Sequence, residues 1–280
     1  LWITTVFLTR PLRQLPWFFT FVFDAWTSYK RLAEFLDLKN EDYHIKSATP
    51  ANSRSLLEIK ALNLTVNHIH KLHDINLTIH PGEIVALIGP VGSGKSLLVK
   101  SMVLETPFTA DVYYKTESSY VPQEYFVMSA SLRDNVAFEY NTSKNQDSII
   151  REKLRQAQFD FELDRVTDGL ETMIGERGLN LSGGQKQRVS LARQLMNPAP
   201  LLILDDPLSA VDTTTEKKLI AEFLKLKEKG HSILLTTQRF TMLKDCDRIF
   251  YIEDGTLKYT DSSEKFLNAP QYQSFLKGLV

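Results

Sequence analysis

The residues best suited to chemistry lie in a glycine-rich segment that reads GPVGSGKS, from Gly89 to Ser96. Glycines let a backbone fold around an anion so that its N–H groups point inward. The apolar run EIVALI before this segment predicts a buried strand. SLLVKSMVL after it predicts a helix, whose N-terminus adds positive potential. Spacing and context together predict a phosphate-binding loop.

Three side chains around this loop have distinct expected roles. In such loops the lysine, here Lys95, reaches the β- and γ-phosphates of a nucleotide, and the hydroxyl of Ser96 binds Mg²⁺. A carboxylate on a neighbouring strand must then hold Mg²⁺ through water. The run LLILD supplies it, because its apolar residues predict a core strand with Asp205 at the C-terminal end, where open α/β sheets bind ligands.

A second glycine motif, LSGGQ, comprises Leu181, Ser182, Gly183, Gly184 and Gln185. The sequence QKQRVSLARQLM, which begins with the last residue of the motif, predicts a helix. The motif therefore forms another exposed anion site at the start of a helix.

The elements that must position these residues alternate between strand and helix. LLEIKALNLTV and INLTI have the pattern of antiparallel strands, with a turn at His80–Gly82, whereas EIVALIG, PLLILDD and HSILLTT predict short buried strands. Thr213 and Glu216 have the spacing of a capping box at the start of a helix. This order predicts an α/β fold with a mostly parallel sheet covered by helices.

The first part of the chain differs from the rest. Residues 1–36 hold all three tryptophans, and their apolar stretch LPWFFTFVFDAW is interrupted by Asp24. Two interpretations are open: the cytoplasmic end of a membrane helix running into a connecting helix, or an amphipathic arm of a soluble protein. Residues 37–55 are polar and lack periodicity, which predicts a linker, and residues 56–280 form the main domain.

Composition narrows the class of protein. Lysine plus arginine number 33 against 34 aspartates plus glutamates, a net charge of -1, so nothing indicates nucleic acid as the main partner. The single cysteine, Cys246, cannot form a disulfide within the chain and is expected to be a small buried residue. No run of about 18 uncharged apolar residues provides a complete membrane span. The chain begins with Leu1 and is expected to be part of a longer protein.

The phosphate loop, LSGGQ and LLILDD occur in the order and spacing of ABC ATPases, and residues 56–280 resemble that family. The resemblance implies a P-loop NTPase fold with an antiparallel β subdomain and a helical subdomain. It also implies ATP and Mg²⁺ as cofactors. In that family two ATP-binding domains stack head to tail, and each ATP lies between the phosphate loop of one domain and the LSGGQ of the other.

The resemblance also extends the expected site. Gln123, in YVPQ, is similar to the glutamine that contacts Mg²⁺ and signals to the membrane domain, and an ordinary polar loop residue is the alternative. Ser209–Asp212 is similar to the loop that crosses between the two domains. Mg²⁺ is thus expected at Ser96, Gln123 and Asp205. The residues expected to bind ATP are Gly89, Pro90, Val91, Gly92, Ser93, Gly94, Lys95, Ser96, Leu97 and Gln123.

Within the family, GPVGSGKS, YVPQ, SASLRDNV and DDPLSAVD together resemble the first ATP-binding domain of the C subfamily, the multidrug-resistance-protein group. The segment ending SYKRLAEFL resembles the last helix of the preceding membrane domain in that group, which favours the membrane-helix interpretation of residues 1–36. The resemblance implies a membrane protein whose ATP-binding domain lies on the cytoplasmic face. Transmembrane domains and a second ATP-binding domain are its implied partners.

Three positions depart from the family pattern. Asp206 stands where active ABC ATPases carry a glutamate that polarises the attacking water, and the shorter side chain draws the carboxylate back by about 1 Å, a scale on which general-base geometry is unforgiving. Thr237 stands where the family has a histidine that contacts the γ-phosphate, and threonine carries no proton charge at pH 7. No aromatic residue lies near Val66 to stack on adenine, and the neighbouring histidines are either its substitute or surface residues.

These departures predict a site that binds ATP and hydrolyses it slowly, while the intact LSGGQ completes a competent site on a partner. Ordinary turnover with Asp206 as a working base is the alternative. The leading function is the ATP-driven motor of an exporter, in which hydrolysis is coupled to solute transport. The other candidates are an ATP-gated regulatory domain and a soluble ABC ATPase acting on ribosomes or DNA, which residues 1–36 and the net charge disfavour. A non-identical partner domain is expected, because a symmetric pair would have two weakened sites.

Overall fold

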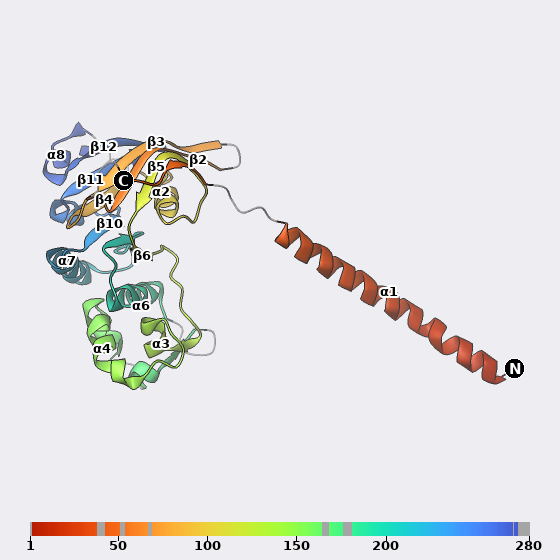
Figure 1. Cartoon of the computed structure of the whole chain (residues 1–280). Helices are drawn as coiled ribbons and strands as arrows, with labels where there is room; N and C mark the ends of the chain where they lie inside the picture. The colour runs from red at the N-terminus through yellow and green to blue at the C-terminus, as the bar shows by residue number, and fades with distance from the viewer. Residues whose placement is uncertain are drawn as a thin grey trace. The chain divides into compact units, whose positions relative to one another are not determined.

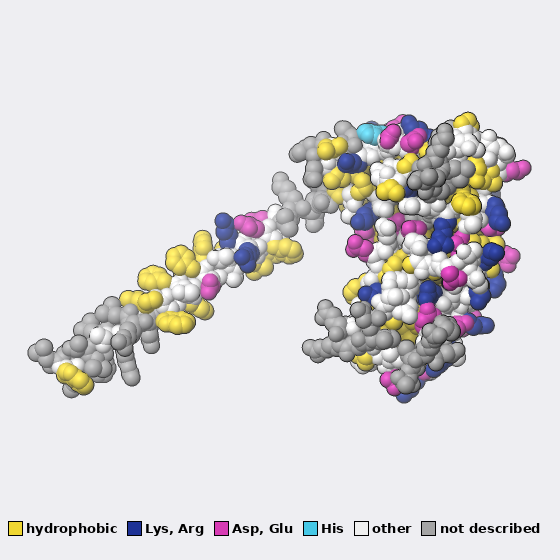
Figure 2. Space-filling view, turned by 180° about the vertical axis from the view of Figure 1, so that it is seen from behind, with side chains coloured by type: hydrophobic (Ala, Val, Ile, Leu, Met, Phe, Trp, Pro, Cys, Tyr) yellow, Lys and Arg dark blue, Asp and Glu magenta, His cyan; other side chains and the backbone are white. Residues whose placement is uncertain are grey.

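The computed structural model describes residues 2–37, 43–50, 54–66, 69–163, 168–175, 181–270 and 272–273. The chain divides into two units, Leu1–Asp42 and Tyr43–Val280. The described part of the first unit is essentially one helix, α1 (Trp2–Leu36), which carries exposed apolar side chains (Figure 2). Among the described residues, no helix combines the length and the apolar character needed to cross a membrane. The interpretation of residues 1–36 as the end of a membrane helix is not confirmed and stays a prediction.

A six-stranded sheet forms the centre of the second unit and confirms the predicted α/β architecture. Its strand order is β12-β11-β4-β10-β9-β6, and all neighbours pair in parallel except β12, which runs antiparallel to β11 at one edge. The strands are β4 (Ile84–Ile88), β6 (Ser118–Val121), β9 (Leu201–Leu204), β10 (Ser232–Thr236), β11 (Arg248–Glu253) and β12 (Thr256–Ser262).

Strands β4, β9 and β10 are buried at every position because both faces of the sheet are covered. Successive side chains of each strand point to opposite faces and so join two different clusters of buried residues. One cluster includes residues of helices α6 (Gly183–Met196) and α7 (Thr213–Glu228). The other includes residues of α2 (Lys95–Met102) and of a second sheet. The apolar runs in the sequence therefore correspond to strands covered on both sides.

The second sheet has the order β1-β5-β2-β3. As predicted, β2 (Leu57–Val66) is antiparallel to β3 (Ile69–Ile79), and it is also antiparallel to β5 (Thr109–Lys115). The edge strand β1 (His44–Ser47) pairs in parallel with β5 and lies inside the predicted linker 37–55. In an edge strand only alternate side chains need to be half-buried, as they are in β1. Its sequence, HIKS, is therefore largely polar and does not indicate a strand.

Helices α3, α4 and α6 gather at one end of the second unit, away from β2, β3 and β5 (Figure 1). Arg133 of α3 is 5% exposed and pairs with the carboxylates of Asp147 (2.6 Å) and Glu171 (2.9 Å), which ties α3 to its neighbours. These helices match the expected helical subdomain. The remaining elements are α3 (Leu132–Ala137), α4 (Asp147–Gln156), α5 (Asp160–Leu163), α8 (Ser263–Leu267), the short pair β7 (Ala130–Ser131) and β8 (Met173–Ile174), and 3₁₀ turns at Lys144–Gln146, Gly169–Glu171 and Phe240–Asp245.

The predicted capping box of Thr213 and Glu216 is wrong. Helix α7 is capped one residue earlier, by Asp212, whose Oδ1 accepts hydrogen bonds from two backbone N–H groups of the first turn at 2.8 and 3.0 Å. Aspartate is as good an N-cap as threonine, so the sequence alone does not distinguish Asp212 from Thr213 as the N-cap residue. The shift of one residue turns Glu216 away from the cap, and its side chain is buried inside the unit.

Candidate functional site

The glycine-rich segment joins β4 to α2 at the edge of the sheet where the parallel strands end. Gly94 has a φ of +103°, in the left-handed region that side chains disfavour, and it immediately precedes α2. A Cβ on Gly89 would lie 2.0 Å from the carbonyl oxygen of Ile252, so no side chain fits there. The path of the loop therefore requires glycine at both positions.

Lys95 opens α2 with its side chain turned back over the loop. Its Nζ donates hydrogen bonds to the carbonyl oxygens of Gly89 (2.8 Å) and Pro90 (2.7 Å). Burial lowers the pKa of this ammonium group below its usual value, and the nearby carboxylates of Asp206 and Asp205 oppose that shift. A partly desolvated cation at the mouth of a loop gains stability when it meets an anion such as a phosphate.

Asp205 and Asp206 follow β9 and share a hydrogen-bond network. The Oδ1 of Asp205, a residue 3% exposed, accepts a hydrogen bond from Thr236 Oγ1 (2.7 Å), which itself accepts one from the backbone N–H of Asp206 (2.7 Å). The carbonyl oxygen of Asp206 accepts hydrogen bonds from Gln187 Nε2 (2.9 Å) and Ser209 Oγ (3.0 Å). Bonds on both sides of Asp206 fix the backbone from which its carboxylate extends.

The surroundings of Asp206 suit a general base. Burial raises the pKa of its carboxyl group, repulsion from Asp205 adds to the rise, and the charges of Arg239 and Lys95 oppose it. A higher pKa makes an ionised carboxylate a better proton acceptor. In its electrostatics this side chain therefore resembles a catalytic base, and it differs from a glutamate in reach.

One small pocket brings most of the predicted residues together. It lies where parallel strands β4, β6, β9 and β10 end, and a wider groove beside it shares its lysine, serine and glutamines. The pocket is lined by Lys95, Ser96, Gln123, Asp205, Asp206, Thr236, Thr237 and Gln238. The groove adds Val91, Gly92, Gly94 and Leu97. Gly89, Pro90 and Ser93 line neither space, and the first two face Lys95 through their carbonyl oxygens.

Gln238 is a site residue that the sequence did not indicate. It is exposed and lines both the pocket and the groove. Thr237, which the sequence did indicate, is 1% exposed, and its Oγ1 accepts a hydrogen bond from the backbone N–H of Arg239 (3.0 Å). Thr236, Thr237 and Gln238 all line the pocket, so the alternation of a strand does not single out Gln238, and no local signal in the sequence points to it.

The residues present fit ATP with Mg²⁺. The hydroxyl of Ser96, the amide oxygen of Gln123 and the carboxylate of Asp205 are oxygen ligands of the kind that Mg²⁺ prefers. Over the described ranges, no group of three or more His, Cys, Asp or Glu could hold a metal ion. Ser93 Oγ is buried and has no hydrogen-bond partner in the described part of the chain, so the loop keeps an unused hydroxyl inside it.

The LSGGQ motif starts α6 with a capping box. Ser182 is the N-cap residue, and its Oγ accepts a hydrogen bond from the backbone N–H of Gln185 (3.3 Å). The side chain of Gln185 returns the bond, because its Oε1 accepts from the N–H of Ser182 (2.8 Å). Leu181 before the cap is buried. The predicted helix is present but begins at Gly183, two residues before the predicted start, so both glycines lie in its first turn. This helix start lies outside the pocket that holds Lys95.

The two glycines of LSGGQ have different surroundings, which predicts different stabilities. A Cβ on Gly184 would lie 2.6 Å from the carbonyl oxygen of Ala210, whereas one on Gly183 would meet nothing within 4 Å. Gly184→Ala is expected to cost about 1–3 kcal/mol of unfolding free energy by overpacking. Gly183→Ala is expected to be neutral or to stabilise by about 0.5 kcal/mol. Urea unfolding of both variants measures the difference in their unfolding free energies. Equal values would show that the backbone at Ala210 moves aside freely.

Two other expectations concern single residues. Val66 ends β2, but His68 and the side chain of His70, the suggested partners for adenine, lie outside the described residues. Cys246 is buried as predicted, and burial raises the pKa of its thiol well above the usual range.

Comparisons with known proteins show which family the chain resembles. The family model for ABC transporters matches residues 72–209, which include the phosphate loop, LSGGQ and both aspartates. Mouse ATP-binding cassette sub-family C member 2 is 33% identical over 96% of the chain, and ABC transporter C family member 3 of Arabidopsis thaliana is 32% identical over 94%. Multidrug resistance-like ATP-binding protein MdlA of Buchnera aphidicola is 29% identical over 92%. The chain spans 18%, 17% and 46% of the length of these three relatives.

Proposed function

We propose, since the chain belongs to the ABC transporter family, that it is the ATP-binding domain of a C-subfamily exporter and couples ATP binding and hydrolysis to solute transport. The observation that carries the proposal is the pocket in which Lys95, Ser96, Gln123 and two aspartates meet. It combines groups that bind phosphate, groups that bind Mg²⁺ and a carboxylate able to accept a proton from water. This combination of groups suits the hydrolysis of a nucleoside triphosphate.

Each group of the pocket has a role in that reaction. The N–H groups of the loop and Lys95 bind the phosphates, and Ser96, Gln123 and Asp205 hold Mg²⁺. An Mg²⁺ ion held by these residues would offset the charge on the phosphate oxygens. Asp206 accepts the proton of the attacking water, with its backbone fixed by Thr236 and Gln187. Catalysis here rests on positioning and electrostatics.

The proposed partners of this domain are inferred from two features that lie outside the pocket, the LSGGQ motif and the helix α1. LSGGQ lies on α6, outside the pocket, so its anion site serves the nucleotide of a second ATP-binding domain stacked head to tail. The exposed apolar side chains of α1 suit contact with transmembrane domains, and the ATP-binding domain lies on the cytoplasmic face. Acidic and basic side chains are interspersed on the face of the larger unit seen in Figure 2.

The site of this chain hydrolyses ATP slowly, and its LSGGQ completes a faster site on a non-identical partner. Two observations support the slow site: Asp206 has a shorter side chain than a glutamate, and Thr237 is buried with its hydroxyl engaged by Arg239. A slow site also suits an ATP-gated regulatory domain. Transport of a labelled solute against its gradient distinguishes an exporter from such a regulator.

The experiment that tests the slow site follows labelled ATP in the assembled protein. The nucleotide is photo-crosslinked after one turnover, and the label on this chain is identified. We expect intact ATP on this chain and ADP on the partner. ADP on this chain at a comparable rate would contradict the slow site and would make Asp206 a working base.

A further inference from the structure

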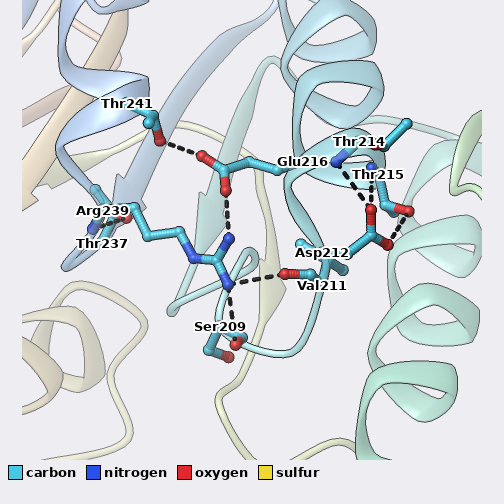
Figure 3. Close-up of polar contacts among 9 residues, drawn as sticks. All are labelled: Ser209, Val211, Asp212, Thr214, Thr215, Glu216, Thr237, Arg239 and Thr241. Atoms are coloured by element: carbon cyan, nitrogen blue, oxygen red, sulfur yellow. Dashed lines mark hydrogen bonds and ion pairs between the residues drawn. The ribbon is translucent and has the colours of Figure 1, made fainter.

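Arg239 connects two segments beside the pocket. It is the third residue after β10, and its side chain crosses to the loop between β9 and α7 (Figure 3). There its Nη2 donates hydrogen bonds to the carbonyl oxygens of Val211 (2.8 Å) and Ser209 (3.4 Å). One guanidinium group therefore holds the backbone of the segment Ser209–Asp212.

Glu216 holds that guanidinium in place. It lies in α7, is 3% exposed, and accepts hydrogen bonds from Arg239 Nη1 and Thr241 Oγ1 (Figure 3). A buried carboxylate with two donors orients the arginine firmly. The planar guanidinium group donates to the carboxylate of Glu216 through one terminal nitrogen and to the loop carbonyl oxygens through the other. A lysine ammonium group cannot make these bonds with the same geometry.

The backbone of Arg239 bonds to a residue of the pocket wall. Its N–H donates to Thr237 Oγ1 (3.0 Å), and Thr237 and Gln238 line the pocket with Lys95 and Ser96. The same residue thus bonds to the pocket wall through its main chain and to the loop through its side chain. A second connection reaches the loop from Asp206, because Ser209 Oγ donates to the carbonyl oxygen of Asp206.

We propose that Arg239 is a positioning residue that ties the end of β10 to the segment Ser209–Asp212, so that nucleotide in the pocket orders this segment. The inference rests on the proposed function, in which the segment crosses to the partner domain. ATP in this pocket then sets the shape of the surface that the partner meets. The coupling lies entirely within this chain and does not require Asp206 to act as a base.

Hydrogen exchange of the full chain tests this coupling, without nucleotide and with MgATP, at a concentration where sedimentation shows a monomer. In the wild type we expect ATP to slow the exchange of both the phosphate loop and residues 208–213. At ATP about 100-fold above Kd, linkage slows fully coupled amides by up to about 100-fold. In Arg239→Met we expect the phosphate loop to stay protected while the protection of residues 208–213 falls at least by about half, since the bond from Asp206 remains.

Two further variants separate coupling from simple destabilisation. Arg239→Lys keeps a charge beside Glu216 but loses the fork, so it is expected to fold well and still lose most of the coupled protection. Arg133→Met removes an arginine that is more deeply buried than Arg239 and pairs with Asp147 and Glu171, neither of which lines the pocket, and it is expected to leave the coupling intact. Equal protection of residues 208–213 in the wild type and both Arg239 variants would overturn the inference. If ATP did not slow hydrogen exchange at the phosphate loop of the wild type, the proposed function itself would be overturned, and the inference with it.

Discussion

Asp206→Glu is expected to raise ATP turnover at this site by about 10- to 100-fold. The backbone of Asp206 is held by Thr236 (2.7 Å) and Gln187 (2.9 Å), so the added methylene advances the carboxylate into the pocket and leaves the chain in place. Burial already raises the pKa of this carboxyl group, which suits a proton acceptor. A positioned base contributes about 10²–10⁴-fold, and the wild-type aspartate retains part of that.

The same substitution is expected to lower stability slightly. Asp206 has a φ of +53°, a region that aspartate tolerates better than glutamate, at a cost of about 1 kcal/mol. Turnover and melting temperature should therefore change in opposite directions, which general stabilisation of the fold would not produce. Phosphate release is measured in the assembled protein with the partner's site inactivated. Asp206→Asn is the control and should remove the residual activity, and unchanged turnover in Asp206→Glu with ATP bound would place the defect elsewhere, at Thr237 first.

Lys95→Met is expected to weaken the binding of MgATP by at least about 100-fold. Each hydrogen bond from a charged group contributes about 1.5–3 kcal/mol, two phosphates are contacted, and every 1.4 kcal/mol is about tenfold in affinity. The nucleotide-free fold should survive, because methionine fills the space and removes the desolvation that lowers the pKa of the ammonium group. Loss of affinity without loss of fold is the expected signature.

Fluorescence titration with a labelled ATP analogue and the ATP-dependent rise in melting temperature measure this effect. Lys100→Met is the matched control, because Lys100 lies on the same helix with an exposed side chain. Its affinity should equal that of the wild type. Comparable affinity in Lys95→Met would show that the ammonium group stays on the carbonyl oxygens of Gly89 and Pro90 when nucleotide binds.

The strands that carry the pocket could be predicted from sequence because their patterns are strong. The runs EIVALI, LLILD and HSILLTT are buried on both faces, and each of them ends in a residue that lines the pocket or joins its loop. Parallel strands place their C-terminal ends at one edge, so local prediction of the strands before Lys95 and Asp205 was enough to bring these two residues together. Gln123 was placed by the family resemblance, because its strand β6 was not predicted.

Two features were missed for a different reason. The edge strand β1 lies in a polar stretch, and its pairing with β5 depends on a neighbour some 65 residues away in sequence, as His44 opposite Thr109 shows. The cap of α7 depends on a choice between Asp212 and Thr213, which have similar capping strength. In both cases local signals were weak or equal, and contacts distant in sequence decided the outcome.

The sequence by itself determined the chemistry of the site, because glycines, Lys95 and the aspartates after β9 act through residue type and short spacing. The tertiary structure alone decided which side chains after β10 line the pocket and which one holds the neighbouring loop. Thr237 and Gln238 both line the pocket, the first buried and the second exposed, and Arg239 turns to Glu216. These directions follow from where α7 and the segment Ser209–Asp212 pack against the end of β10, and such packing is a long-range property that no local pattern encodes.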